Sequence, residues 1–394
     1  MPTQPWRHRP AQHFPLIPHL FVVPAVLAVA TAVSLFLHSD VNAALLWSQC
    51  HAHSVLPAIS RIRVLGTPAC FLVSFFYAAL DSLRSKAILG VLLAFVGSLL
   101  TVSTVESARR VNAQNHVVSR PTIPWLVFNL VGGALVWQLV IVPAFILAAK
   151  TWPSTAAGHA RLRPGDEEDD RGAGEDRAVS ANTEGRDVAL TEAVAIPVAV
   201  ALGFYVPSTV MLAATSPISI GVWLFFPVYV SLIRQLVRRL LATMRPFRSA
   251  PPCHLESHAQ SVVAVYALPI LASLLAHAFL IVNYLTKADD RKELTRSVVK
   301  FIEIDFQYIG LTLLYWVFVE VGWRVPLAMA MSSVLLGPGA GVALGWLYRE
   351  KLITLGLVGL TPSCGDDEEH REGDRQEGDE RERGQINEQT PLMQ

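Results

Sequence analysis

The chain has 394 residues, of which 52% are hydrophobic and only 16% charged, and its formal net charge is zero. A soluble domain carries about a quarter charged residues, so this composition, with a mean hydropathy of +0.41, excludes an ordinary soluble enzyme. The balanced charge also argues against a nucleic-acid partner. Long uncharged stretches that alternate with short polar joints instead predict a polytopic protein of the lipid bilayer.

Apolar stretches of about 20 residues, long enough to cross a hydrocarbon core of about 30 Å, recur along the chain. The first follows a basic N-terminal segment and is predicted to be a transmembrane helix, with a cleaved signal peptide as the alternative. We predict an all-α, polytopic transmembrane helical bundle of about nine spans, or eight if the stretches on either side of "TSPIS" are one helix. The predicted spans are 17–38, 64–81, 87–105, 123–149, 189–215, 217–234, 260–285, 301–323 and 325–348.

Two charged segments are predicted to lie outside the membrane. Residues 150–188 form an acidic, Gly-rich loop, and residues 363–394 form an acidic tail with few large apolar side chains. Neither segment can bury enough apolar surface to offset its chain entropy, so both are predicted to be disordered. The domain organisation is therefore one multi-span membrane domain, 1–362, interrupted by the loop and followed by the tail.

The span "FIEIDFQYIGLTLLYWVFVEVGW", 301–323, carries three carboxylates, although an ionised acid is costly in hydrocarbon. On a helix with 100° per residue, Glu303 lies on one side, and two other acids, two tryptophans, a tyrosine and a threonine share a stripe about 120° wide on the opposite side. That stripe predicts a helix that lines an aromatic-walled cavity. A carboxylic acid in such a pocket can stay protonated at neutral pH, as a general acid must. The residues of the stripe are Asp305, Tyr308, Thr312, Trp316, Glu320 and Trp323.

A simpler interpretation of the same residues remains open. Asp305 and Glu320 are about 22 Å apart along the helix axis, so each lies nearer a headgroup region than the bilayer midplane. They could be interfacial acids that pair with Lys300 and Arg324, with Trp316 and Trp323 as belt aromatics.

A second group of polar residues surrounds the end of the third predicted span. In "LLTVSTVESARRVNAQNH", Glu106 reaches the membrane edge and is a candidate second acid or base, or the partner of Arg109 or Arg110 in a helix-end salt bridge. Asn129 and Gln138 lie within the next apolar run. An amide that faced lipid would lose its hydrogen bonds, so both are predicted to face the protein interior. Asn129 is a candidate substrate-binding residue or a structural link between helices.

We predict no metal site and no cofactor. The segment "CHAHS", 50–54, offers a cysteine and two histidines without further ligands, and "DDRKE", 289–293, resembles an acid box but contains two cations on a short loop. The four cysteines lack CxxC spacing, so the sequence predicts neither a disulfide framework nor a zinc site.

Four stretches carry a resemblance: "LGTPACFLVSFFYAALDS", "LLTVSTVESARR", "LVFNLVGGALVWQLVIVPAF" and "LLGPGAGVALGWLYRE". They resemble the fungal integral-membrane terpene cyclases of meroterpenoid pathways, of the type found in ascofuranone, ascochlorin and macrophorin biosynthesis. The likeness runs from about residue 60 to 350 and leaves out the 150–188 loop.

The resemblance implies cyclisation of a farnesyl-type chain attached to a polyketide-derived ring. The reaction starts when an epoxide or a terminal olefin is protonated, and it loses no diphosphate and needs no magnesium. It requires a protonated acid, an aromatic pocket and a terminal base. On chemical grounds we assign Asp305 as the acid and Glu106 as second acid or terminal base. The candidate substrate-binding residues are Asn129, Trp137, Tyr308, Trp316 and Glu320.

The sequence therefore predicts a membrane-bound terpene cyclase of the endoplasmic reticulum, with a hydrophobic prenylated small molecule as substrate. The alternative is a proton-coupled transporter or exporter of a small hydrophobic metabolite, which would use intramembrane acids to carry protons. The absence of a visible internal repeat in the sequence counts against that alternative. The substrate ring, epoxide or olefin initiation and membrane orientation stay open.

Overall fold

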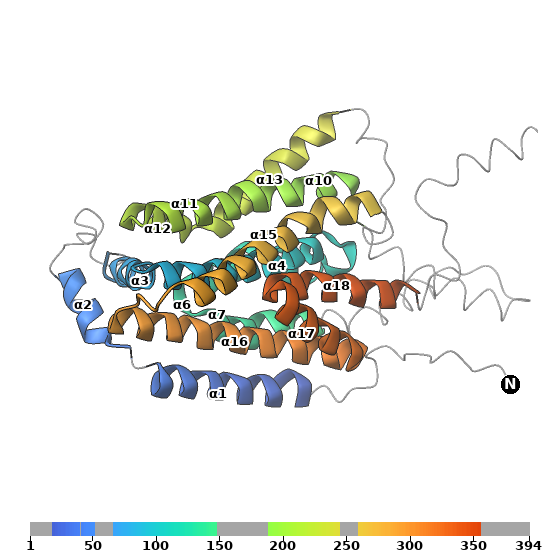
Figure 1. Cartoon of the computed structure of the whole chain (residues 1–394). Coiled ribbons are helices and arrows are strands. Elements are labelled where there is room, and N and C mark those ends of the chain that lie inside the picture. Colours follow the sequence, from blue (N-terminus) through green and yellow to red (C-terminus); the bar gives the residue numbers. More distant parts are fainter. Residues whose placement is uncertain (1–17, 40, 52–65, 148–187, 245–258, 356–394) are drawn as a thin grey trace, which may run out of the picture.

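The computed structural model describes residues 18–39, 41–51, 66–147, 188–244 and 259–355, which form a bundle of helices (Figure 1). These residues contain no β-strand, so the prediction of an all-α protein is confirmed for them. The predicted loop 150–188 and the predicted tail 363–394 lie outside the described residues, apart from Val188. The helices are α1 (Val23–His38), α2 (Ala43–His51), α3 (Gly66–Ala79), α4 (Leu83–Ala108), α5 (His116–Ser119), α6 (Thr122–Val131), α7 (Gly133–Val136), α10 (Leu190–Val200), α11 (Val206–Ala214), α12 (Pro217–Trp223), α13 (Phe226–Thr243), α15 (Ala259–Thr286), α16 (Glu293–Val321), α17 (Arg324–Leu336) and α18 (Pro338–Leu355).

Four helices are long and apolar enough to cross a membrane. They are α4, the continuous helix formed by α10 and α11, α15 and α16. The pair α12 and α13, bent by 54° between them, makes a fifth if it is counted as one span. These candidate spans are consistent with a membrane protein, but the predicted number of nine spans is not confirmed.

Helix α4 forms the centre of the bundle and is buried along most of its length. It packs against α10, α15, α16 and α18, and Figure 1 shows it between these helices. Because α4 touches protein on all sides, its residues are apolar around the whole circumference rather than along one stripe.

The "DDRKE" segment joins α15 to α16 and caps α4. The Asp290 carboxylate accepts hydrogen bonds from the backbone N–H groups of Leu83, at 2.7 Å, and Arg84, at 3.3 Å, at the helix N-terminus. The hydrogen bond from the Arg291 guanidinium holds the pKa of Asp289 below its usual range. Both aspartates of this loop thus have structural partners: Asp290 at the start of α4 and Asp289 in Arg291.

The predicted span 123–149 doubles back on itself instead of crossing. Gly132, with φ +132°, separates α6 from a second helix, Gly133–Leu147. The Asn115 side-chain amide, which precedes α6, donates to the Ala144 carbonyl near the end of that second helix, at 2.7 Å. Both ends of the segment therefore lie together. We call this pair of helices the first hairpin and Gly132–Ala134 its tip.

The predicted span 325–348 is a second hairpin of the same kind. Gly337, with φ +94°, joins α17 to α18. A Cβ atom on Gly341 would lie 2.7 Å from the Met329 carbonyl oxygen, which shows how closely the two helices approach. Arg349 Nε, near the end of α18, lies 2.7 Å from an Oε atom of Glu320, which precedes α17. Hydropathy predicted a span in this segment because its sequence is continuously apolar. A hydropathy pattern does not show that the chain reverses direction within the segment.

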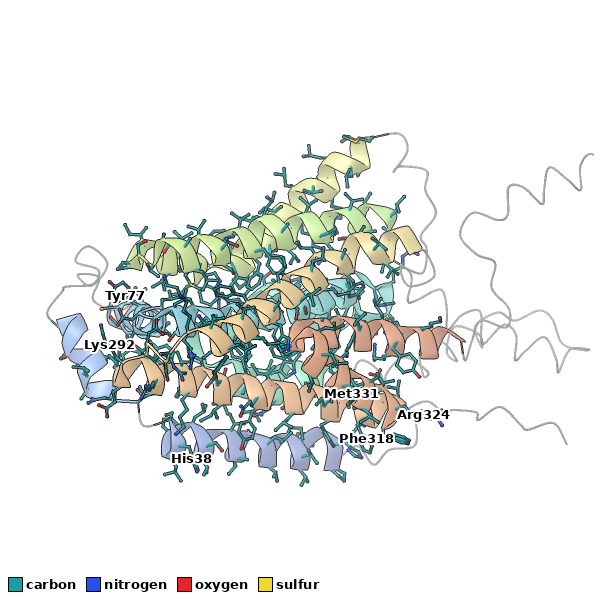
Figure 2. The ribbon with its side chains drawn as sticks, viewed as in Figure 1. His38, Tyr77, Lys292, Phe318, Arg324 and Met331 are labelled. Atoms are coloured by element: carbon teal, nitrogen blue, oxygen red, sulfur yellow. The ribbon has the colours of Figure 1, made fainter. Side chains whose placement is uncertain are left out.

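The bundle has two distinguishable ends. Figure 2 shows His38, Tyr77 and Lys292 at the end where α2 lies, which we call the α2 end. Phe318 and Arg324 lie at the opposite end, which is also where the second hairpin opens.

We predict that Gly341→Ala destabilises the protein. The added methyl group would meet the backbone of α17, and such overpacking costs about 1–3 kcal/mol. The midpoint of thermal unfolding in detergent should fall. Gly310→Ala on α16 is the control, because a Cβ there meets nothing within 4 Å. Equal midpoints for both variants would contradict the close packing of the second hairpin.

Candidate active site

A cavity of about 990 Å³ lies between α3, α4, α16 and the tip of the first hairpin, and we call it the chamber. Its volume is at the upper end of the range of about 300–1,000 Å³ that is typical of ligand pockets. Among its described lining residues, Asp305 supplies the one carboxyl group, and Ser39 and Asn129 supply the other non-aromatic polar side chains. As far as the described residues line it, the chamber is thus an apolar space with a single acid.

Aromatic rings form much of the chamber wall. Phe75 contacts Phe301 edge to face with ring centroids 5.6 Å apart, and Phe76 contacts Trp223 at 5.1 Å. The lining also includes Phe128 of the first hairpin. The negative face of an aromatic ring attracts a cation, so rings on several sides of one space can stabilise a positive charge that moves along a bound chain.

Asp305 lies at the tip of the first hairpin, and its side chain is buried. One carboxyl oxygen, Oδ2, accepts the backbone N–H of Gly133 at 3.1 Å, and the other, Oδ1, accepts that of Ala134 at 3.0 Å. These N–H groups belong to the first turn of a helix and have no partner within it. Asp305 therefore caps, from α16, a helix that begins inside the membrane protein.

The two N–H donors also determine what the carboxyl can do. Hydrogen bonds and a helix N-terminus stabilise the carboxylate that remains when an acid gives up its proton. They hold the resulting anion in a fixed orientation beside the chamber. The arrangement suits proton transfer to a bound molecule.

Gly133 is required for this contact. A Cβ atom at Gly133 would lie 2.8 Å from Asp305 Oδ2 and 2.8 Å from the ring of Phe128. Any side chain at this position would push the carboxyl or the ring away.

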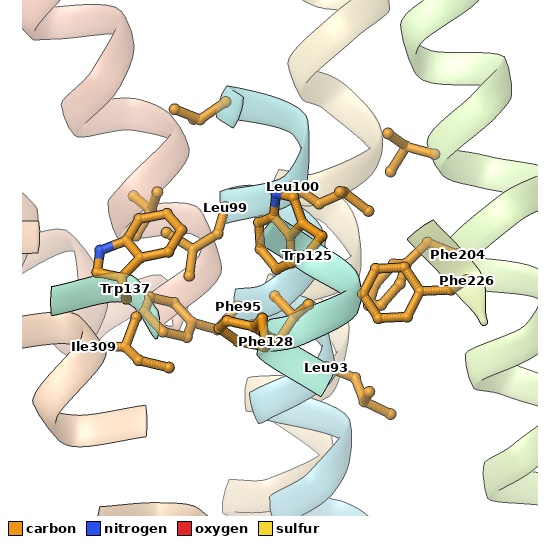
Figure 3. Close-up of a cluster of buried hydrophobic side chains, with 14 of the residues drawn as sticks. Leu93, Phe95, Leu99, Leu100, Trp125, Phe128, Trp137, Phe204, Phe226 and Ile309 are labelled. Carbon is orange, nitrogen blue, oxygen red and sulfur yellow. The ribbon is translucent and has the colours of Figure 1, made fainter. Parts of the chain in front are cut away.

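The tip is held by a cluster of large buried side chains on its far side. Trp125 contacts Trp137 at 5.9 Å and Phe226 at 6.2 Å between ring centroids, and its Nε1 donates to Ser103 Oγ. Figure 3 shows Trp125 and Phe128 within this cluster. The packing fixes the hairpin against α4 and α13 and so fixes the tip.

The structure brings two of the seven sequence-based candidates to the chamber, namely Asp305 and Asn129. The Asn129 amide nitrogen donates to the Leu224 carbonyl at 3.0 Å, so this residue also links the first hairpin to the loop between α12 and α13. Trp137 lies in the core behind the tip. The Tyr308 hydroxyl pairs with Ser34 of α1 at 2.8 Å and does not line the chamber.

Two of the remaining three candidates, Glu106 and Glu320, belong to a buried group of charges, which we call the ion cluster, and the third, Trp316, lies beside it. Arg109 Nε lies 3.1 Å from Glu106, as the salt-bridge interpretation of Glu106 predicted, and the Arg109 guanidinium also lies 3.1 Å from Glu350. Arg349 pairs with Glu320 and Glu350. The guanidinium of Arg349 lies over the rings of Trp346 and Trp316. The members are Glu106, Arg109, Glu320, Arg349 and Glu350.

The ion cluster lies on the other side of the tip from the chamber. Along α16, Glu320 is about 22 Å beyond Asp305 at 1.5 Å per residue, whereas the chamber-lining residues of α16 are 301–306. The ion cluster links the end of α4 to α16 and α18. Its position indicates a structural role.

Sequence reasoning missed two features of the site. Phe71, which lines the chamber from α3, was not singled out because nothing in a uniformly apolar segment marks the inward face. The turn at Gly132 and Gly133 was not predicted, although two adjacent glycines within an apolar run are a signal for a turn.

Cys70 of α3 is disulfide-bonded, which the spacing of the cysteines did not predict. The absence of CxxC spacing excludes only a bond between closely spaced cysteines, so it could not exclude this one.

One comparison with known proteins gives a match. The family model described as the CtvD domain matches residues 22–289, which is more than half of the chain and covers the helices from α1 to α15. No curated protein and no solved structure matches.

We predict that Arg349→Met strongly destabilises the protein. The change leaves Glu320 and Glu350 buried without this partner, and removal of one member of a buried ion pair costs about 3–5 kcal/mol. The thermal unfolding midpoint in detergent should fall sharply. Arg296→Met, which removes a mostly exposed pairing with Asp289, should leave the midpoint nearly unchanged. Similar small shifts in both variants would contradict the structural role of the ion cluster.

Proposed function

Because the chain belongs to the CtvD domain family of fungal secondary-metabolite biosynthesis, we propose that this tailoring enzyme is a membrane-bound terpene cyclase. It cyclises a farnesyl-type chain on a meroterpenoid by acid-initiated carbocation chemistry. The observation that carries the proposal is a single carboxyl group, held by two backbone N–H groups, at an aromatic-walled chamber of about 990 Å³.

The reaction begins with proton transfer from Asp305. The proton passes to the oxygen of an epoxide, whose C–O bond then breaks, or to the terminal carbon of an olefin. Asp305 becomes a carboxylate that the Gly133 and Ala134 N–H groups stabilise. Each following double bond attacks the cation, forms a C–C bond and moves the charge along the chain past the aromatic rings.

The reaction ends with loss of a proton from a carbon next to the final cation. Glu106, the candidate base from sequence, lies in the ion cluster. The carboxylate left on Asp305 is the anionic group that the described lining residues offer for this step. The proton that Asp305 donates is then replaced in the same turnover, and the product is an isomer of the substrate.

The lining supports a prenyl chain without a diphosphate as substrate. The described lining residues include no lysine, arginine or histidine that could bind a diphosphate group. Asn129 and Ser39 offer hydrogen bonds to the oxygen atoms of an attached ring. We therefore assign Asn129 to substrate binding and expect neither a diphosphate nor a bound cofactor in the reaction.

We place the protein in the membrane of the endoplasmic reticulum. Its long apolar helices fit a bilayer, and the disulfide at Cys70 is of the kind that forms in an oxidising compartment such as the lumen of that organelle.

We predict that Asp305→Asn abolishes cyclisation in protein that still inserts into the membrane, because the amide oxygen can still accept one of the two backbone N–H groups. The amide keeps the size of the carboxyl but donates no acidic proton, and loss of a general acid lowers turnover by about 10²- to 10⁴-fold. Microsomes containing each protein would receive an epoxyfarnesyl phenol, and products would be identified by mass spectrometry and NMR. Cyclisation gives an isomer of unchanged mass, whereas a transporter would return the substrate intact.

Glu303→Gln is the matched control, because Glu303 lies on the same helix but does not line the chamber. It should keep wild-type turnover. Wild-type turnover in Asp305→Asn would remove Asp305 from the mechanism. Absence of any cyclised product with the wild-type enzyme, for both the epoxide and the corresponding olefin, would contradict the proposed function.

We predict that Gly133→Ala lowers kcat with little change in KM. The methyl group displaces the Asp305 carboxyl, and a misplacement of about 1 Å can cost about 10²-fold in rate. Steady-state kinetics of the reconstituted enzyme provide the measurement. Gly310→Ala on the same helix as Asp305 should change neither constant. An unchanged kcat for Gly133→Ala would show that the tip does not position the acid.

A further inference from the structure

The chamber wall is incomplete on one flank of the bundle. Among the described lining residues, Phe36 of α1 is 82% exposed and Val131 of α6 is 68% exposed. Leu130 of α6 and Trp47 of α2 are also exposed lining residues. These four side chains therefore border both the chamber and the surroundings of the protein. We call them the rim.

Two apolar stripes lead to the rim. On α1, Val26, Val29 and Val33 are exposed and recur at helical spacing before Phe36. On α6, Ile123 and Val127 do the same before Leu130 and Val131. The exposed large side chains on these stripes are hydrophobic, as those of lipid-facing helix surfaces are. The medium outside the rim is therefore hydrocarbon rather than water.

Two other directions out of the chamber are closed by described elements. Helix α4 is buried along the opposite wall, and the tip with Asp305 separates the chamber from the ion cluster. The rim also lies close to the acid, because Val131 precedes Gly133 by only two residues. A Cβ atom on Gly132 would meet nothing within 4 Å, so there is free space beside the tip.

We propose that the rim is a lateral portal through which the prenyl chain of the substrate enters the chamber directly from the bilayer. A farnesyl-type chain partitions into hydrocarbon because each buried CH₂ group contributes about 0.8 kcal/mol. Access through the rim spares the chain a passage through water. The proposal rests on the proposed function for the identity of the occupant.

Val131→Trp tests the portal, with Ile123→Trp as its matched control. Both residues are exposed on α6, but only Val131 lines the chamber. In proteoliposomes, Val131→Trp should lower kcat/KM by roughly tenfold or more, while kcat at saturating substrate changes less than about twofold. Ile123→Trp should match the wild type. Thermal unfolding midpoints would establish that both variants fold.

A labelling experiment separates the portal from the proposed chemistry. A farnesyl phenol that carries a diazirine on its terminal isoprene unit is incorporated into phosphatidylcholine liposomes with each protein and activated by light. In the wild type and in Ile123→Trp, label should reach α3 residues that line the chamber, such as Phe71 and Phe75. In Val131→Trp this labelling should fall by the same factor as kcat/KM.

The outcomes are distinguishable. Equal labelling of α3 in both tryptophan variants, or no labelling of α3 in the wild type, would overturn the portal. If labelling depends on residue 131 but none of the proteins gives a cyclised product, the portal holds and the proposed cyclase activity fails.

Discussion

The structure depends on one contact, in which the Asp305 carboxyl accepts the N–H groups of Gly133 and Ala134. Hydrocarbon offers no hydrogen-bond partner to a backbone group, so a helix that begins inside a membrane needs a partner from the protein. Asp305 supplies that partner, and its own burial is tolerated because both oxygens are bonded. The contact lets the first hairpin end beside the chamber, and it fixes a carboxyl group at the chamber wall.

The two hairpins account for the division of the bundle into two halves. Both open at the end opposite α2, where they add helices to the packing, and both reverse inside the bundle at glycines with positive φ, Gly132 and Gly337. The ion cluster lies in the half that the hairpins fill. The other half holds the chamber and its aromatic rings. The two acids of α16 are thus separated along the helix. Glu320 belongs to the ion cluster in one half, and Asp305 lies at the chamber in the other.

Composition and hydropathy predicted the all-helical membrane protein, and the wheel of residues 301–323 predicted that Asp305 faces the protein interior. The helical stripe could not show that Asp305 lines the chamber while Trp316 and Glu320 do not. Residues on one stripe can have different surroundings at different depths along the helix. Hydropathy counted each hairpin as a span because it registers length and polarity but not direction. The cavity itself could not be predicted, since its wall combines α3, α4, α12 and α16, and that combination follows from tertiary packing.

The contact at the tip has a consequence for the folding of the chain during its synthesis on the ribosome. Asp305 follows its two backbone partners by 172 and 171 residues. At about 5–20 residues per second, a ribosome needs roughly 10–30 s to add that length of chain. During this interval the newly made first hairpin lacks its acceptor from α16, so the insertion machinery or bound water must satisfy those groups until the later helix arrives. The helical bundle can therefore finish folding only after its C-terminal part, which includes α16, has been synthesised.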